Sequence, residues 1–337
     1  MPVTMRDVAN LASVSIKTVS NVLNDYPHIR PATRDRVLAA VDELGYRMNH
    51  SARALRSGRS GAISLVVPDI RNAYFAELAA EVIDAAAAYD LSVVIEQSGG
   101  VPERELQLVQ GRRTVPVDGV LYSVAGLGEE DAGQLADLPT PAVLLGERIF
   151  RGPLDHVTMQ NVEGARAATE HLLDGGRTRI LALGSGPDET ISSAGLRLHG
   201  YREAIAARGL DPDPGLVVDA QPWLREGGAA AMRAAIESGL RFDGVVAFND
   251  LIGLGALRAL LDAGIRVPDD VAVIGFDDID ETRYASPSMS TIDPGRREIA
   301  ETAVAFLLDR IAPTGVEIPP REHLSRFALR PRESSRF

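Results

Sequence analysis

The sequence predicts a small all-α head containing a helix-turn-helix, followed by a large α/β body of two lobes with parallel sheets flanked by helices. Three observations predict this fold. Three short helical patterns fill the first 46 of the 337 residues. After residue 61, short apolar runs alternate with amphipathic helical stretches, which is typical of parallel sheets. The net charge also changes sign, from +4 in residues 1–60 to −16 in the remainder.

The composition excludes several classes of protein. Hydrophobic residues make up 45% of the chain, so large cores can be buried. There is no cysteine, which excludes disulfides, thiolate metal sites and a cysteine nucleophile. No run of about 18 apolar residues occurs, so no membrane span is expected. The first seven residues lack the apolar segment of a signal peptide, so we expect a cytoplasmic protein.

The head carries start and stop signals for three helices. Thr4 and Asp7 have the spacing of a capping arrangement at the first helix. Ser15 can cap the second helix, and Pro31 is tolerated at the first position of a third. Gly45 then suits a left-handed C-cap. Two short helices joined by a tight turn and braced by a third form a helix-turn-helix.

The second helix would enter the major groove of DNA by its N-terminal end. Lys17 can donate to guanine, Asn21 can pair with a base edge or bond a phosphate, and Ile16 can pack on a thymine methyl. Nearby hydroxyl groups could anchor phosphates, which positions a helix without determining sequence; they belong to Thr4, Ser15, Thr18 and Ser20. The alternative is a three-helix bundle with another role.

A basic segment follows the three helices. Residues 46–56 predict a short helix that carries three arginines around one aliphatic side chain, Leu55, and residues 57–61 are a flexible linker. A basic helix with a lone apolar wedge is suited to insertion into the minor groove. The alternative is a linker whose basic face is simply solvated.

The head resembles that of the lactose-repressor (LacI/GalR) family. The resemblance rests, in order and spacing, on VTMRDVA (3–9), VSIKTVSNVLN (14–24), TRDRV (33–37) and LGYRMN (44–49). The hinge from Asn49 through Ala52 to Leu55 matches as well. The resemblance implies that Ile16, Lys17 and Asn21 face the bases of double-stranded operator DNA. It also implies that the hinge binds DNA, with Leu55 as the minor-groove wedge. Arg30 departs from the family, which usually has a better N-cap such as serine there.

The resemblance extends through most of the chain and implies a body like the periplasmic sugar-binding proteins, in which three strands cross between the lobes. We therefore expect a helix-turn-helix domain at 1–46, a hinge helix and linker at 47–60, and a ligand-sensing domain at 61–337. Lobe one would comprise about 61–160 and 292–322, and lobe two about 161–291 and 323–330. Within lobe one, a helix at 76–89 would place Leu78, Val82 and Ile83 on its apolar side.

A ligand of such a body would lie in the cleft outside the C-terminal ends of the strands. Carboxylates, amides, an arginine and aromatic rings follow the predicted strand ends, and they suit a hydroxyl-rich ligand such as a sugar. The candidate ligand-binding residues are Asp69, Asn72, Tyr74, Phe75, Ser193, Arg197, Trp223, Asn249 and Asp277. The alternatives are turn formation and helix capping for the polar residues, and core packing for the aromatic ones. Gly146 and Gln160 stand where the family more often has aspartate, which would alter ligand specificity.

No motif predicts catalysis. The chain has no phosphate-binding loop, no HExxH zinc pair and no nucleophile elbow. The six histidines show no metal spacing, and the glycines of 253–258 are assigned to helix packing. We therefore expect no enzyme and no cofactor.

The sequence thus predicts a homodimeric, ligand-controlled repressor. Its partners would be operator DNA, a sugar or sugar derivative, and a second copy of the chain. Some members of the family that the chain resembles form tetramers through a C-terminal tail of leucine heptads. The last eight residues contain no such heptad, so the resemblance implies a dimer rather than a tetramer. The alternatives are a solute-binding protein of transport and a sugar-modifying enzyme, but neither explains residues 1–60.

Overall fold

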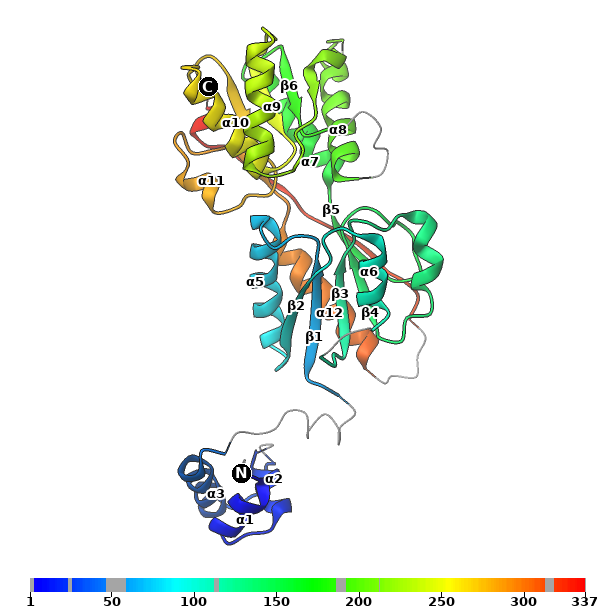
Figure 1. Ribbon diagram of the computed structural model, residues 1–337, viewed down its shortest axis with the longest axis vertical. Helices are drawn as coiled ribbons and strands as arrows, with labels where there is room; N and C mark the ends of the chain where they lie inside the picture. The colour runs from blue at the N-terminus through cyan, green and yellow to red at the C-terminus, as the bar shows by residue number, and fades with distance from the viewer. Residues whose placement is uncertain are drawn as a thin grey trace. The chain divides into compact units, whose positions relative to one another are not determined.

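The computed structural model describes residues 3–23, 26–46, 59–111, 115–185, 192–211, 213–312 and 318–336. The chain divides into two compact units, Met1–Ser60 and Gly61–Phe337 (Figure 1). The first unit is helical, and the second contains all the strands found among the described residues. The predicted fold class is therefore confirmed.

Three helices occur among the described residues of the head: α1 (Met5–Leu11), α2 (Ile16–Leu23) and α3 (Pro31–Leu44). Thr4 and Asp7 form the expected capping box, with Thr4 N 2.8 Å from Asp7 Oδ2. Arg30 provides no side-chain cap for α3, so the proline at its first position has to set the start of the helix. Gly45 ends α3 with a φ of 60°. Three valines are fully buried between the helices: Val8, Val19 and Val37.

Parallel strands build the two sheets of the body. The six-stranded sheet has the order β11-β5-β4-β3-β1-β2, and the four-stranded sheet has the order β7-β6-β8-β9. The first comprises β1 (Ala62–Val67), β2 (Ser92–Gln97), β3 (Gly119–Ser123), β4 (Ala142–Leu145), β5 (Asp155–Met159) and β11 (Glu322–Ser325). The second comprises β6 (Ile180–Leu183), β7 (Val217–Val218), β8 (Gly244–Ala247) and β9 (Ala272–Ile274). Two further strands pair antiparallel, β10 (Thr291–Asp293) and β12 (Ala328–Arg330).

Helices cover both sheets, as Figure 1 shows. Those near the six-stranded sheet are α5 (Ala73–Ala87), α6 (Pro102–Val109) and α12 (Arg296–Ile311). Those near the four-stranded sheet are α7 (Asn161–Asp174), α8 (Ser193–Ala207), α9 (Arg225–Glu237) and α10 (Asp250–Asp262). The remaining elements are short: α11 (Glu281–Tyr284) and the 3-10 turns η1 (Glu129–Leu135), η2 (Pro214–Leu216) and η3 (Glu333–Ser335). Packing joins α5 to α12, α7 to α8, and α9 to α10.

Both faces of the four-stranded sheet are buried. Along β6, Ile180 and Ala182 join the core beneath α7 and α8, whereas Leu181 and Leu183 join the core beneath α9 and α10. Successive side chains of a strand point to opposite faces. This explains why the strands read as continuous apolar runs rather than as alternating patterns.

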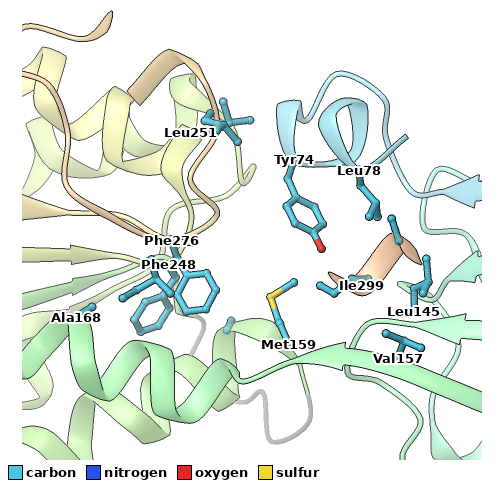
Figure 2. Packing of buried hydrophobic residues seen from close by; sticks show 14 of the residues in the cluster. Tyr74, Leu78, Leu145, Val157, Met159, Ala168, Phe248, Leu251, Phe276 and Ile299 are labelled. Carbon is cyan, nitrogen blue, oxygen red and sulfur yellow. The ribbon is translucent and has the colours of Figure 1, made fainter. Parts of the chain in front are cut away.

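The chain crosses between the two halves of the body three times. It leaves the six-stranded sheet after β5, returns from β10 into α12, and leaves again from β11 into β12. One buried cluster runs through both halves, and Figure 2 shows Phe248 and Phe276 of one half near Tyr74 and Met159. The expected lobe boundary after residue 322 falls inside β11, whose Ser325 pairs with Met159 of β5.

Strand β5 was not expected, because three of its five residues are polar. All five are nevertheless buried, and the Asp155 carboxylate is fully inaccessible. Arg310 Nη2 lies 2.8 Å from Asp155 Oδ1, and Arg321 Nη2 lies 2.8 Å from Oδ2. Although burial acts in the opposite direction, the hydrogen bonds from these two arginines lower the pKa of Asp155 to about 2. Two arginines distant in sequence therefore make a buried carboxylate tolerable.

Two predictions about helix faces, one at Ile83 and one at Gly253 and Gly255, can be compared with the structure. The prediction that Ile83 lies on the apolar side of its helix is wrong, because its side chain is 44% exposed. Leu78 and Val82 do face the core, and Ile83 lies a further 100° around the helix. The assignment of Gly253 and Gly255 to helix packing is confirmed, since both lie in α10. A Cβ on Gly255 would lie 2.0 Å from the Arg225 carbonyl oxygen of α9.

Candidate functional site

Helix α2 presents one face of the head to solvent. Ile16 is 39% exposed, Lys17 is exposed, and Asn21 is half-buried, while Val19 and Val22 face the core. Residues three and four apart lie on the same side of a helix, so Lys17, Ser20 and Asn21 share a face. Two of the four hydroxyls expected at phosphates, those of Thr4 and Ser15, act as local caps in the head, and the Thr18 hydroxyl lies 2.9 Å from that of Ser15. Ser15 Oγ accepts from Thr18 N at 3.1 Å, and Thr4 Oγ1 donates to Asp7 at 2.7 Å. The expected hinge contacts Asn49, Ala52 and Leu55 lie outside the described residues.

A cleft of about 490 Å³ lies between the two sheets of the body. This volume is in the range of small-molecule sites. Both sheets supply its walls, through residues at or just beyond the carboxyl ends of β1, β3, β4, β5, β8 and β9. All nine candidate ligand-binding residues line it: Asp69, Asn72, Tyr74, Phe75, Ser193, Arg197, Trp223, Asn249 and Asp277.

Arg197 is the most constrained polar side chain in the cleft. It is 3% exposed, and its Nε donates to Asn161 Oδ1 at 2.8 Å. One terminal nitrogen donates to the Phe248 carbonyl oxygen. The guanidinium carbon lies 3.8 Å from the centre of the Phe276 ring, an attractive arrangement for a desolvated cation. These contacts fix the guanidinium plane before any ligand arrives.

Asp277 faces Arg197 across the same wall. Its Oδ1 lies 3.8 Å from Arg197 Nη2, and the residue is 5% exposed. Burial raises the pKa of Asp277 to about 7, with only partial compensation from the Arg197 and Arg296 charges. Its carboxyl group therefore changes charge in the neutral range.

The two asparagines serve as helix caps, which was the alternative considered for them. Asn72 Oδ1 accepts from Tyr74 N at 3.1 Å at the start of α5. Asn249 Oδ1 accepts from Ile252 N at 2.7 Å at the start of α10, and its Nδ2 donates to the Trp223 carbonyl oxygen at 3.2 Å. Both residues also line the cleft, so capping holds their remaining polar groups in fixed positions there.

The aromatic side chains form the walls between these polar groups. The Tyr74 and Phe75 rings meet edge to face, with centroids 5.2 Å apart. Burial raises the pKa of the Tyr74 hydroxyl, which keeps it protonated as a donor. Trp223 Nε1 donates to the Gly184 carbonyl oxygen at 3.0 Å. This bond orients the indole ring that lines the cleft.

Several charged residues that line the cleft were not predicted from the sequence. Glu147 follows β4 by two residues, and its carboxylate accepts a hydrogen bond from Ser193 across the cleft. Arg148 donates Nε to the Leu127 carbonyl oxygen at 3.1 Å. Arg71 pairs with Asp69 at 2.7 Å. The rule that identified Asp69, a polar residue just after a parallel strand, would also have found Glu147.

Neither a metal centre nor a membrane helix is evident in the part of the chain that the structure describes. No group of three or more histidine, aspartate or glutamate side chains there could hold a metal ion. Among the same residues, no helix is both long and apolar enough to cross a membrane.

Comparison with known proteins explains the combination of head and cleft. Residues 4–49 match the bacterial regulatory proteins of the lacI family, and residues 169–335 match the periplasmic binding protein-like domain. Catabolite control protein A of Priestia megaterium is 30% identical over 307 residues, which cover 91% of this chain and 92% of that protein. The chain belongs to the lacI family. It is a DNA-binding transcription regulator and not an enzyme.

Other members of the lacI family match over 82% to 99% of the chain. The regulator CelR of Thermobifida fusca is 34% identical over 342 residues, with 98% of each chain covered. A solved CelR–cellobiose complex has 32% identity, a TM-score of 0.70 and coverage of 98% and 99%. A lacI-family regulator from Sanguibacter keddieii has 48% identity and a TM-score of 0.76, covering 82% of this chain and 99% of its own. The lac repressor dimer bound to operator has 27% identity and a TM-score of 0.81, with 99% of each covered.

Proposed function

We propose that this lacI-family regulator is a homodimeric repressor whose affinity for operator DNA changes when an uncharged sugar binds in the body cleft. The observation that carries the proposal is the cleft itself. A fixed guanidinium, a carboxyl group that titrates near pH 7, capped amides and aromatic faces all line one cavity. Because its partner is operator DNA, we place the protein in the cytoplasm.

On the head, we propose that Ile16, Lys17 and Asn21 contact base edges, and that Thr4, Ser15, Thr18 and Ser20 contact phosphates. The exposure of Ile16 and Lys17 at the start of α2 supports this assignment, because the N-terminal end of a recognition helix enters the major groove. The hinge residues Asn49, Ala52 and Leu55 complete the proposed DNA contacts, with Leu55 as the minor-groove wedge.

The composition offers a direct test of the DNA contact, because Lys17 is the only lysine in the chain. An amine-reactive reagent should modify Lys17, and peptide mass spectrometry separates this product from the N-terminal amine. DNA from upstream of the protein's own gene should slow the modification, whereas random DNA at moderate salt should not. Lys17→Ala should weaken specific binding by about 10- to 100-fold in a gel shift. Equal modification with and without specifically bound DNA would contradict the assignment.

The charges lining the cleft support an uncharged effector. Among the described lining residues, three carboxylates face three guanidinium groups: Asp69, Glu147 and Asp277, with Arg71, Arg148 and Arg197. When Asp277 is ionised the two sets of charges balance, so a phosphate would add negative charge with no cation in excess to receive it. Carboxylates and amides instead accept and donate hydrogen bonds to hydroxyl groups, while rings pack on the CH faces of a sugar. The complex of the relative CelR with cellobiose agrees with this class of ligand.

The effector class can be tested with the single tryptophan of the chain, Trp223, which lines the cleft. Trp223 emission and thermal unfolding should be followed with cellobiose, ribose, glucose 6-phosphate and hypoxanthine. An uncharged sugar at 100 times its Kd should raise the free energy of unfolding by about 2.7 kcal/mol. A response to glucose 6-phosphate or hypoxanthine, with none to either uncharged sugar, would contradict the proposal.

Exposed apolar side chains support the homodimer. Ile83 on α5, Tyr89 after it and Ile95 on the edge strand β2 are 44%, 56% and 43% exposed. Apolar groups together with an open strand edge are typical of a surface that pairs with another chain. The relative whose structure is the lac repressor dimer supports the same state. Analytical ultracentrifugation should give the mass of two chains, and a mass of four would contradict the proposal.

A further inference from the structure

Two consecutive residues at the edge of the cleft, Asp277 in its wall and Asp278 next to it, adopt a backbone conformation that side chains disfavour. Asp277 has a φ of 124° and Asp278 a φ of 50°. Such a residue is strained and persists only where its surroundings hold it. Because Asp277 also lines the cleft, the groups that hold this turn determine where its carboxylate lies.

One arginine from the other half of the body holds the turn. Arg296 donates one terminal nitrogen to the Asp277 carbonyl oxygen, and its Nη2 lies 3.0 Å from the Asp278 carbonyl oxygen. Arg296 is the first residue of α12, which packs on the six-stranded sheet. Gly295, with a φ of 78°, fixes this helix start, because a Cβ there would lie 2.4 Å from the Arg326 carbonyl oxygen.

Glu77 of α5 completes the arrangement. Its Oε2 lies 2.5 Å from Arg296 Nη2, and its Oε1 accepts from Asp280 N at 2.8 Å. The pair is largely withdrawn from solvent, with side chains 14% and 28% exposed. Glu77 and Arg296 therefore join two helices of one half of the body to the 277–280 segment of the other half. Neither residue lines the cleft.

We propose that Arg296, oriented by Glu77, is a positioning residue that sets the Asp277 carboxylate for the effector and couples effector binding to the arrangement of the two halves. This inference rests on the proposed function. A ligand that hydrogen-bonds to the Asp277 carboxylate acts on a turn that Arg296, from the other half of the body, already holds in place. Effector binding and the juxtaposition of the halves therefore influence each other.

Arg296 and Glu77 act on the pKa of Asp277 in opposite directions. Cationic groups lower the pKa of Asp277, and anionic groups raise it. The groups that act on it come from five elements or their flanking loops: Arg197 of α8, Arg296 of α12, Glu77 and Tyr74 of α5, Glu147 beyond β4, and Asp250 of α10. Loss of the Arg296 charge should raise the pKa of Asp277, whereas loss of the Glu77 charge should lower it.

The structure offers a matched control one residue away. Arg297 of α12 pairs with Glu81 of α5 at 3.1 Å, so this ion pair joins the same two helices. The Arg297 side chain is 73% exposed, and its hydrogen bond and ion pair go to Glu81 and not to the 277–280 segment. Variants of Arg297 and Glu81 should therefore weaken the contact between α5 and α12 without changing how the 277–280 segment is held.

The test compares Arg296→Gln and Glu77→Gln with Arg297→Gln and Glu81→Gln. Cellobiose binding is measured by Trp223 emission from pH 5.5 to 8.5. In the wild type, affinity should fall as pH drops through the Asp277 midpoint, because the ionised carboxylate is the better acceptor. Arg296→Gln should weaken binding about tenfold at pH 7 and move the midpoint to higher pH. Glu77→Gln should move the midpoint to lower pH, and the control variants should leave it unchanged.

A ligand-free measurement separates this inference from the proposed function. Hydrogen exchange of the 276–281 segment should accelerate in Arg296→Gln and Glu77→Gln but not in the controls. If no sugar binds the wild type, the proposed function fails, and the exchange experiment still decides whether Arg296 holds the turn. Wild-type exchange in Arg296→Gln, or midpoints that move in the same direction in both variants, would overturn the inference. If Arg296→Gln does not fold, the pH midpoint and the hydrogen exchange of Glu77→Gln alone decide the inference.

Discussion

Two carboxylate–arginine pairs line the cleft, and they behave in opposite ways. Asp69 and Arg71 are 2.7 Å apart, and the hydrogen bond from Arg71 lowers the pKa of Asp69. Asp277 and Arg197 are 3.8 Å apart, yet burial raises the pKa of Asp277 to about 7. The Arg71 side chain is 75% exposed, whereas that of Arg197 is 4% exposed. Access to water, more than distance, therefore decides what each pair contributes.

The largest loss of sugar affinity should come from removing the Arg197 side chain. Arg197→Ala leaves the Asn161 and Phe248 oxygens without their donor and Asp277 without its neighbouring cation. Loss of one partner of a buried ionic network costs several kcal/mol. The affinity for the sugar identified with Trp223 should therefore fall more than about 100-fold, while operator binding remains. Arg202→Ala, an exposed change on the same helix, is the control, and equal affinities in the two variants would break the comparison.

The buried carboxyl group should also shape the pH dependence of stability. The pKa of Asp277 in the folded protein is about 7, above its ordinary value of 3.8. Between these values the folded state holds a proton that the unfolded chain has lost, so the free energy of unfolding falls as pH rises across this window. Asp277→Asn should remove this contribution and weaken sugar binding about 10- to 100-fold at pH 8. Urea unfolding at pH 4.5 and 7.5 checks the slope, which must differ between variant and wild type.

A smaller effect is expected at the aromatic wall. Phe75 is half-buried, and its ring meets that of Tyr74 at 5.2 Å. Phe75→Ala removes ring contact and apolar area without exposing a charge, so sugar affinity should fall about tenfold and show an unchanged pH midpoint. A moved midpoint in a fluorescence titration would indicate that the ring also controls the ionisation of Asp277.

The smallest effect should follow removal of the exposed pair. Solvated ion pairs contribute about 0–1 kcal/mol, so Arg71→Ala should change sugar affinity less than about fivefold. The change should shrink further at high salt, because exposed charges are screened. Calorimetric titration at low and high salt measures both quantities. An effect as large as that of Arg197→Ala would mean that exposure does not distinguish the two pairs.

The sequence was sufficient for the fold class, for the three helices of the head and for nine of the residues that line the cleft. Parallel strands bring their carboxyl ends together, so Asp69, Asn249 and Asp277 could be grouped without coordinates. Strand β5 could not be found in this way. Its buried Asp155 depends on Arg310 and Arg321, which lie 155 and 166 residues away. Its residues form no apolar run of the kind that predicts a buried strand.

The contribution of Arg296 was hidden for a related reason. Its partners are two backbone carbonyls and Glu77, 219 residues away. No pattern of side chains encodes a bond to a carbonyl oxygen. The capping roles of Asn72 and Asn249 were visible only as alternatives, because an asparagine after a strand has the same signature whether it binds a helix start or a ligand.

The position of β11 at the edge of the six-stranded sheet has a consequence for biosynthesis. Asp155 and the arginine beside that strand are separated by 166 residues, so a ribosome adding 5–20 residues per second takes roughly 8–33 s to supply the second after the first. Until Arg310 and then Arg321 have been made, the carboxylate lacks the two counter-ions that it has in the folded interior. The half of the body nearest the head in sequence therefore cannot be completed before β11 is made, and β12 of the other half follows β11. A truncated message would yield an unfinished sensor rather than a smaller one.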